Sequence, residues 1–126
     1  MGQGYLIDSN TIIDFFNYAL PKGGINFLLA IDPKISIITQ IEIFSKKEIS
    51  KSEFIALSDF IEAATIYEVN NDIAVKTINL RLKHSVKLAD AIIAASAIHN
   101  NLTLITRNVA DFKKIEGLEI INPHSI

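Results

Sequence analysis

The feature that most constrains the fold is a short apolar run that ends in a carboxylate and is followed at once by a change of period. Residues 5–7 (Tyr-Leu-Ile) have the character of a buried strand, and from Asn10 onward apolar side chains recur at helical spacing. Asp8 lies at the junction, where Ser9 or Asn10 is expected to cap the helix. Ligands collect at the carboxyl ends of strands in open α/β sheets. Asp8 is therefore either a functional residue or only another capping residue.

Strand-like and helix-like segments alternate along the rest of the chain. Strands are expected at 5–7, 34–38, 65–69, 102–106 and 118–121, and helices from residue 10, at 25–31, from Thr39, at 51–63, at 71–84 and at 88–98. Residues 107–112 are expected to form a loop or turn. This alternation predicts a three-layer α/β/α domain with a mostly parallel central sheet flanked by helices.

Composition limits the kinds of protein and of functional site that this chain can form. The 126 residues fit a single domain, 1–126, and the hydrophobic fraction of 49% argues against disorder. The absence of cysteine excludes disulfides, thiolate zinc sites and cysteine nucleophiles, and it permits a reducing cytoplasm. No export signal and no apolar run of membrane-spanning length is present. We expect a soluble cytoplasmic protein that does not enter a membrane.

The net charge of −2 does not exclude an anionic partner. When the four acids discussed below are set aside as a metal-filled cluster, 10 acids face 12 Lys and Arg, which leaves +2. Basic residues form three groups: Lys46, Lys47 and Lys51; Arg81, Lys83, His84 and Lys87; and Arg107, Lys113 and Lys114. Each group is either a solvated helix face or a phosphate contact.

Four acids and one amide are expected to meet at the carboxyl edge of the sheet. Asp8 ends the first strand, Glu42 and Asp90 lie near the starts of helices, and Asn108 and Asp111 follow the strand at 102–106. Each acid also has a structural explanation, because Glu42 has capping-box spacing from Thr39 and Asp90 suits a helix dipole. Together, such carboxylates repel one another unless a cation intervenes. Oxygen donors favour Mg²⁺ or Mn²⁺, and the three histidines, His84, His99 and His124, are too far apart in sequence to suggest a zinc pair.

Four short motifs carry a resemblance to a known family. They are Leu-Ile-Asp-Ser-Asn-Thr at 6–11, Ser-Ile-Ile-Thr-Gln-Ile-Glu at 36–42, Leu-Ala-Asp-Ala-Ile-Ile-Ala-Ala at 88–95, and Leu-Ile-Thr-Arg-Asn-Val-Ala-Asp-Phe at 104–112. Each motif alone is weak, but their order and the chain length together resemble the PIN domain, and most closely the VapC-type toxins. The resemblance covers essentially the whole chain.

The resemblance implies a metal-dependent endoribonuclease with Asp8, Glu42 and Asp90 as shared acids. It also implies a small antitoxin protein that blocks the site and a tendency to form a homodimer. The alanine-rich residues 89–97 and the high apolar fraction are consistent with association.

The residues suggest a division of roles within such a site. We expect Asp8 and Asp90 to bind the principal ion, and Glu42 to help hold it or to orient water. Asn108 and Asp111 would complete the site, since a helical turn would bring them onto one face. The remaining expected contributors are Ser9, Asn10 and Thr106 as hydrogen-bonding neighbours, and Arg107 as a phosphate contact or an ordinary loop arginine.

Two rival functions remain open at this stage. A receiver-like phosphoacceptor domain is also a small α/β protein with an acidic edge, but it needs an acid pair at the end of the first strand, where residues 6–9 provide one carboxylate. A PIN-fold RNA-binding or protein-binding module without catalysis is the other alternative. An RNA cleavage assay separates catalysis from binding alone.

Overall fold

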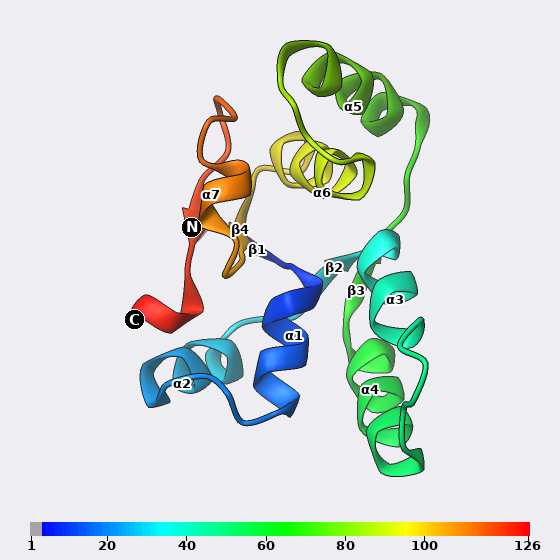
Figure 1. Cartoon of the computed structure of the whole chain (residues 1–126), viewed down its shortest axis with the longest axis vertical. Coiled ribbons are helices and arrows are strands. Elements are labelled where there is room, and N and C mark those ends of the chain that lie inside the picture. The colour runs from blue at the N-terminus through cyan, green and yellow to red at the C-terminus, as the bar shows by residue number, and fades with distance from the viewer. Residues whose placement is uncertain (1–3) are drawn as a thin grey trace.

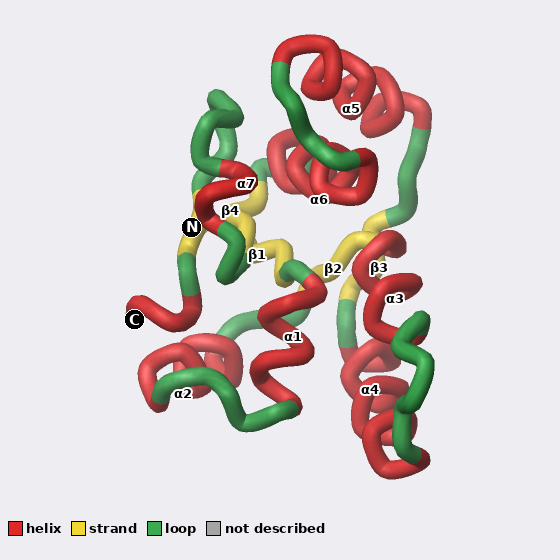
Figure 2. Tube along the Cα trace, viewed as in Figure 1, coloured by secondary structure: helices red, strands yellow, loops and turns green. Residues whose placement is uncertain are grey.

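The computed structural model describes residues 4–126 and has the alternating architecture that the sequence predicts. Its elements are β1 (Gly4–Ile7), α1 (Ser9–Phe16), α2 (Lys22–Ala30), β2 (Lys34–Ser36), α3 (Ile37–Phe44), α4 (Lys51–Ala63), β3 (Thr65–Tyr67), α5 (Asn71–Lys83), α6 (Leu88–His99), β4 (Leu102–Ile105), α7 (Val109–Phe112), β5 (Ile120–Ile121) and a terminal 3-10 helix, η1 (Pro123–Ser125). Figure 1 shows the chain in sequence colours, and Figure 2 distinguishes helices, strands and loops. Within residues 4–126 no helix is both long and apolar enough to span a bilayer.

The strands pair in parallel, as expected. β4 lies between β1 and β5, and β2 pairs with β3 beside β1. In the register of the central pair, Ile7 lies opposite Ile105. The residues that follow these strands, Asp8 and Thr106, therefore emerge side by side at the carboxyl edge.

Two apolar clusters fill the space on either face of the sheet. Because successive strand residues point to opposite faces, Leu6 and Leu104 join one cluster and Ile7 and Ile105 join the other. The first cluster takes in α6 and α7, and the second takes in α1, α3 and α4. In Figure 1, α5 and α6 accordingly lie above the strands, and α1, α2 and α4 lie below them. This confirms the predicted three-layer α/β/α class.

Helix α6 is buried through its small residues. Ala91, Ala94, Ala95 and Ala97 are all fully buried, so most of the alanine-rich segment lies in the core. Small side chains allow this helix to approach the sheet closely. Most of the exposed large apolar residues lie on other elements, although Leu88 at the start of α6 is 55% exposed.

Several expected boundaries are wrong, and local capping explains the most informative ones. Asp8, rather than Ser9 or Asn10, is the N-cap of α1. The strand expected at 34–38 ends at Ser36, whose hydroxyl caps α3 by accepting a hydrogen bond from the Ile38 amide at 3.1 Å. Thr39 is thus inside α3, and its hydroxyl is buried without a partner among the described residues.

Other corrections are small. The capping box lies at Ser50 and Glu53, at the start of α4, and not at Thr39 and Glu42. The strands expected at 65–69, 102–106 and 118–121 are each shorter, α2 begins earlier than expected, and the loop expected at 107–112 contains α7. The helix expected at 51–63 has those bounds in the structure.

A buried carboxylate ties three separated segments together. Asp14 of α1 accepts hydrogen bonds from Arg107 Nη1 at 2.7 and 2.8 Å, and His124 Nε2 of η1 lies 2.8 Å from the same carboxylate. Asp14 is 5% exposed, whereas the Arg107 side chain is about half exposed. The guanidinium of Arg107, expected to contact phosphate or solvent, is bound to Asp14.

We predict that Asp14→Ala lowers the free energy of unfolding by about 2 kcal/mol, because a charged donor loses its buried acceptor. Denaturant unfolding followed by circular dichroism measures the change. Asp32→Ala is the matched control, since Asp32 is exposed and makes no ion pair in residues 4–126. Equal stability of the two variants would contradict a bracing role for Asp14.

Candidate active site

The centre of the candidate site is the carboxylate of Asp8, which is 3% exposed. Its Oδ1 accepts a hydrogen bond from the Ser9 amide at 2.8 Å. Its Oδ2 accepts one from Thr106 Oγ1 at 2.9 Å and one from Asn10 Nδ2 at 3.1 Å. These three donors fix the orientation of the carboxylate. Ser9 contributes through its backbone, and Thr106 and Asn10 contribute through their side chains.

Asn10 and Thr106 also join the ends of β1 and β4. Asn10 Nδ2 donates to Thr106 Oγ1 at 3.2 Å, and Asn10 Oδ1 accepts from the Arg107 amide at 3.0 Å. Thr106 Oγ1 in turn accepts from the Asn108 amide at 3.0 Å. The loop after β4 is therefore held against the start of α1, with Asp8 between them.

Burial raises the pKa of Asp8 above its ordinary value of 3.8. The hydrogen bonds from Thr106, Ser9 and Asn10 oppose that shift, and the charge of Glu42 adds to it. Glu42 is exposed on α3, and no described residue donates a hydrogen bond to its carboxylate. The structure therefore brings Glu42 near enough to repel Asp8 while leaving its side chain free to turn.

Burial likewise raises the pKa of Asp90, which is half-buried in the first turn of α6. The charges of Asp8 and then Asp111 raise it further, and the charge of Lys87 lowers it. Asp90 thus interacts electrostatically with Asp8, which follows β1, and with Asp111 of α7. The acids form a series in space, from Glu42 through Asp8 and Asp90 to Asp111.

The expected helical turn after β4 is present. The Asp111 amide donates to the Asn108 carbonyl at 3.1 Å, so these two residues lie one turn apart in and before α7. Both are exposed, and neither side chain has a hydrogen-bond partner among the described residues. Asp111 interacts with Asp90, whereas the charges acting on Asp8 do not include Asp111.

The oxygen atoms of these acids suit a hard divalent cation, but the side chains do not yet surround one position. All its charged donors are carboxylates, two of them have raised pKa values, and a cation would relieve their repulsion. No three Asp, Glu or His side chains in residues 4–126 are grouped closely enough to enclose an ion. Glu42 and Asp111 would have to turn inward, which their exposure allows.

Two lysines that the sequence assigned to different basic groups also lie beside the acids. Lys87 and Lys114 line one hollow together with Asp90 and Asp111. Sequence spacing could not reveal this, because the two lysines come from turns far apart in the chain.

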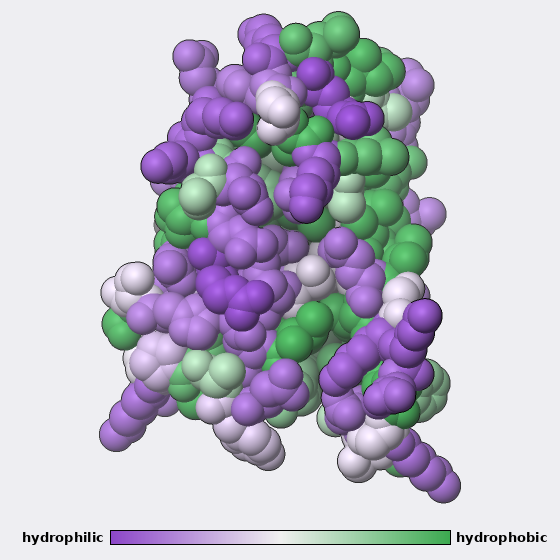
Figure 3. All heavy atoms as spheres, in the orientation of Figure 1, coloured by the Kyte–Doolittle hydropathy of each residue, from purple (hydrophilic) through white to green (hydrophobic). Residues whose placement is uncertain are grey.

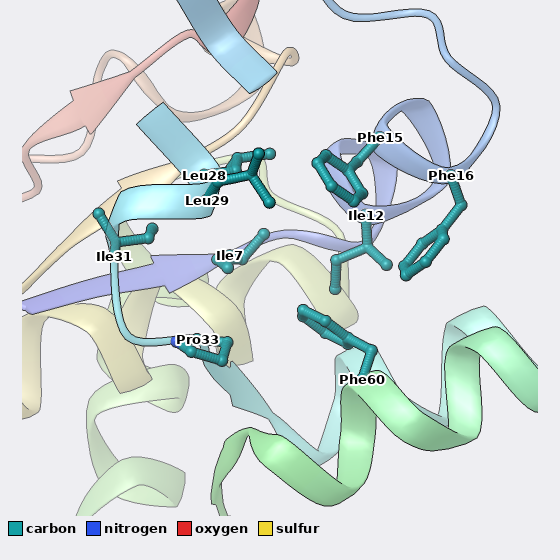
Figure 4. Close-up of a pocket in the computed structure, with 9 residues that line it drawn as sticks. All are labelled: Ile7, Ile12, Phe15, Phe16, Leu28, Leu29, Ile31, Pro33 and Phe60. Atoms are coloured by element: carbon teal, nitrogen blue, oxygen red, sulfur yellow. The ribbon is translucent and has the colours of Figure 1, made fainter. Parts of the chain in front are cut away.

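A separate apolar groove lies on the other side of the sheet. It has a volume of about 230 Å³. Its lining residues come from β1, α1, α2, α4 and the turn before β2: Ile7, Ile12, Phe15, Phe16, Leu28, Leu29, Ile31, Pro33 and Phe60. Figure 4 shows these side chains facing a common space between α1, α2 and α4. The sequence pattern did not single out this groove.

Comparison with known proteins identifies the fold. The sequence profile of the PIN domain matches residues 5–118. A protein from the toxin–antitoxin complex of Klebsiella pneumoniae is 32% identical, with a TM-score of 0.79 and coverage of 98% of this chain and 100% of that chain. A protein of VapBC2 from Rickettsia felis, bound to a promoter DNA fragment, is 25% identical, with a TM-score of 0.81 and coverage of 94% and 97%.

A chain of DNA-bound VapBC from Salmonella typhimurium has a similar fold at 22% identity, with a TM-score of 0.82 and coverage of 97% and 99%. No curated protein gave a significant match. The profile match covers most of the chain, and the structural matches cover nearly all of it. The chain is a member of the PIN-domain family.

Proposed function

We propose that this protein is a divalent-metal-dependent endoribonuclease and the toxin of a VapBC-type pair that acts in the cytoplasm. The observation that carries the proposal is the buried carboxylate of Asp8, held in one orientation by hydrogen bonds. Asp90 is close enough for the charge of Asp8 to raise the pKa of Asp90. Membership in the PIN family and the similarity to chains from toxin–antitoxin complexes support it.

Asp8 and Asp90 would hold a Mg²⁺ or Mn²⁺ ion, and Glu42, Asn108 and Asp111 would complete its surroundings. Such an ion lowers the pKa of bound water and stabilises charge on the attacked phosphate. Thr106, Asn10 and the Ser9 amide keep the Asp8 carboxylate in one orientation. Glu42, being exposed and close to Asp8, is suited to accept a proton from the attacking water.

We predict that purified protein cleaves a mixture of structured RNAs with Mg²⁺ or Mn²⁺ and not with chelator. Asp8→Asn and Asp90→Asn should reduce cleavage to the level seen in chelator, because each removes a charge that holds the ion. Asp111→Asn should lower turnover more than RNA affinity. Product analysis on gels and anisotropy binding measure these effects.

The alternative is a PIN-fold module that binds RNA or protein without cutting. Full activity in chelator, or in Asp8→Asn, would contradict the metal-nuclease proposal. RNA binding by the wild type without cleavage in either ion would favour the alternative.

The raised pKa values also predict an effect on stability in chelator. A carboxyl whose folded pKa lies above its unfolded value binds its proton more tightly in the folded state. Its contribution to stability therefore falls as pH rises from about 3.8 through the raised folded pKa, and then stays low. Asp8→Asn removes this penalty, so at pH 7 in chelator the variant should unfold at no lower denaturant concentration than the wild type.

The wild type should gain more from added Mn²⁺ than Asp8→Asn does, since binding to the folded state alone is stabilising. Denaturant midpoints at pH 4 and pH 7, with and without Mn²⁺, give the comparison. A variant that is clearly less stable than wild type in chelator at pH 7 would mean that the hydrogen bonds to Asp8 outweigh its burial.

We further propose that an apolar stripe on α5 and the apolar groove between α1, α2 and α4 bind different protein partners. Val75, Ile78 and Leu82 form an exposed stripe on α5, with Leu82 81% exposed. Figure 3 shows apolar residues along the upper right of the molecule, where Figure 1 has α5. This stripe suits a homodimer. The groove between α1, α2 and α4 suits an apolar segment of an antitoxin, because its lining is entirely apolar.

A pair of variants separates these surfaces. Leu82→Glu should convert dimer to monomer in sedimentation while leaving antitoxin binding intact. Leu29→Glu, in the groove, should weaken antitoxin binding while leaving the dimer intact. A wild type that is monomeric at high micromolar concentration would contradict the dimer, and unchanged antitoxin affinity in Leu29→Glu would contradict the groove assignment.

A further inference from the structure

A polar hollow beside the proposed metal site combines both signs of charge. It has a volume of about 140 Å³ and lies between the turn before α6 and the end of α7. Residues 85–87 and Asp90 line one side, and Ala110, Asp111 and Lys114 line the other. The hollow therefore joins two of the proposed metal ligands to two lysines.

Neither lysine is committed to another partner. Within residues 4–126, no hydrogen bond or ion pair engages the ammonium group of Lys87 or Lys114. Lys87 is the N-cap of α6 without a side-chain capping bond, and its charge acts on Asp90, whose pKa it lowers. Both side chains are exposed and free to take a ligand.

The backbone beneath each lysine is well held. Arg81 Nε donates to the Val86 carbonyl at 3.3 Å, which braces the turn before Lys87. Lys114 lies between Phe112 and Ile115, which are 0% and 3% exposed. Two fixed backbone positions thus present flexible cationic side chains to one small space.

The charge of the hollow depends on the adjacent acids. The charges of two carboxylates and two ammonium groups sum to zero, so the hollow attracts an anion only weakly when no cation is nearby. A divalent cation at Asp8 and Asp90 would make the same region positive. A backbone phosphate in the hollow would then meet two ammonium groups that have no other partner within residues 4–126. If these lysines were only solvated surface residues, nothing would require both of them to line one hollow.

We propose that Lys87 and Lys114 form a phosphate subsite that holds an RNA strand beside the linkage to be cut. This inference rests on the proposed nuclease function and adds the positioning of its substrate. It assigns to two specific lysines the phosphate contact that the sequence suggested for Arg107, whose Nη1 is bound to the Asp14 carboxylate. Lysine is suited to this role as a compact point charge that binds phosphate.

The test uses Lys87→Gln, Lys114→Gln and the double variant in the full chain. RNA affinity is measured by anisotropy at several salt concentrations, with Mn²⁺ present and a single-stranded RNA whose linkages resist hydrolysis, so that the acids keep their ion. Each substitution should lower the slope of log Kd against log salt by about 0.7, the value for one phosphate contact on a single strand. In the otherwise wild-type protein, KM should rise several-fold with a smaller change in kcat, and arginine at either position should restore it.

Lys113→Gln is the matched control, because it removes the same charge next to Lys114 but Lys113 does not line the hollow. The control should leave the slope unchanged. Equal slopes and KM values for Lys113→Gln and Lys114→Gln would overturn the inference, since general surface charge would then explain both. Unchanged KM in the double variant, with normal cleavage by the wild type, would overturn it too.

Calorimetric Mn²⁺ titration separates direct phosphate binding by the lysines from an indirect effect of the lysines on metal binding. Removing a positive charge beside Asp90 should leave Mn²⁺ affinity equal or higher. Weaker Mn²⁺ binding with an unchanged salt slope would show that the lysines act through the acids, and would overturn the inference. Absence of RNA cleavage by the wild type is a separate outcome that contradicts the proposed function itself.

Discussion

Parallel pairing of β1 with β4 is the interaction on which the rest of the site depends. Their register ends both strands together, at Ile7 and Ile105, so that Asp8 and Thr106 leave the sheet as neighbours. The hydrogen bond between these two side chains spans 98 positions of sequence. Asn10 extends this link to the loop after β4. A shift of one residue in the register would separate these groups and turn the strand side chains to the wrong faces.

Burial of charge is the cost of this arrangement. The pKa of Asp8 is raised mainly by desolvation, although three donors stabilise its ionised form. Asp90 has the same principal cause and adds repulsion from Asp8 and Asp111. Capping and the helix dipole can explain each acid singly, but the repulsion between Asp8 and Asp90 opposes folding at neutral pH. A bound cation would reduce the repulsion, and this connects the electrostatics of the acids to the proposed chemistry.

The sequence predicted the layers, the parallel sheet and the helix at 51–63, because the apolar residues there recur with a clear helical period. It missed the start of α3, where isoleucines on both sides of Ser36 extend the strand pattern past the true boundary. It also missed what depends on distant contacts. The bond from Arg107 to Asp14 joins residues 93 apart, and the meeting of Lys87 with Lys114 depends on how α6 and α7 pack. The acids could be named from their motifs, but the burial of Asp8 and the exposure of Glu42 could not.

The central claim is that Asp8 and Asp90 together hold a divalent ion. Anomalous diffraction from crystals soaked in Mn²⁺ tests it most directly, because the signal locates the ion without reference to activity. The account predicts an anomalous peak about 2.1 Å from a carboxylate oxygen of each of these two residues. A well-occupied Mn²⁺ peak elsewhere, with none at Asp8 and Asp90, would contradict it.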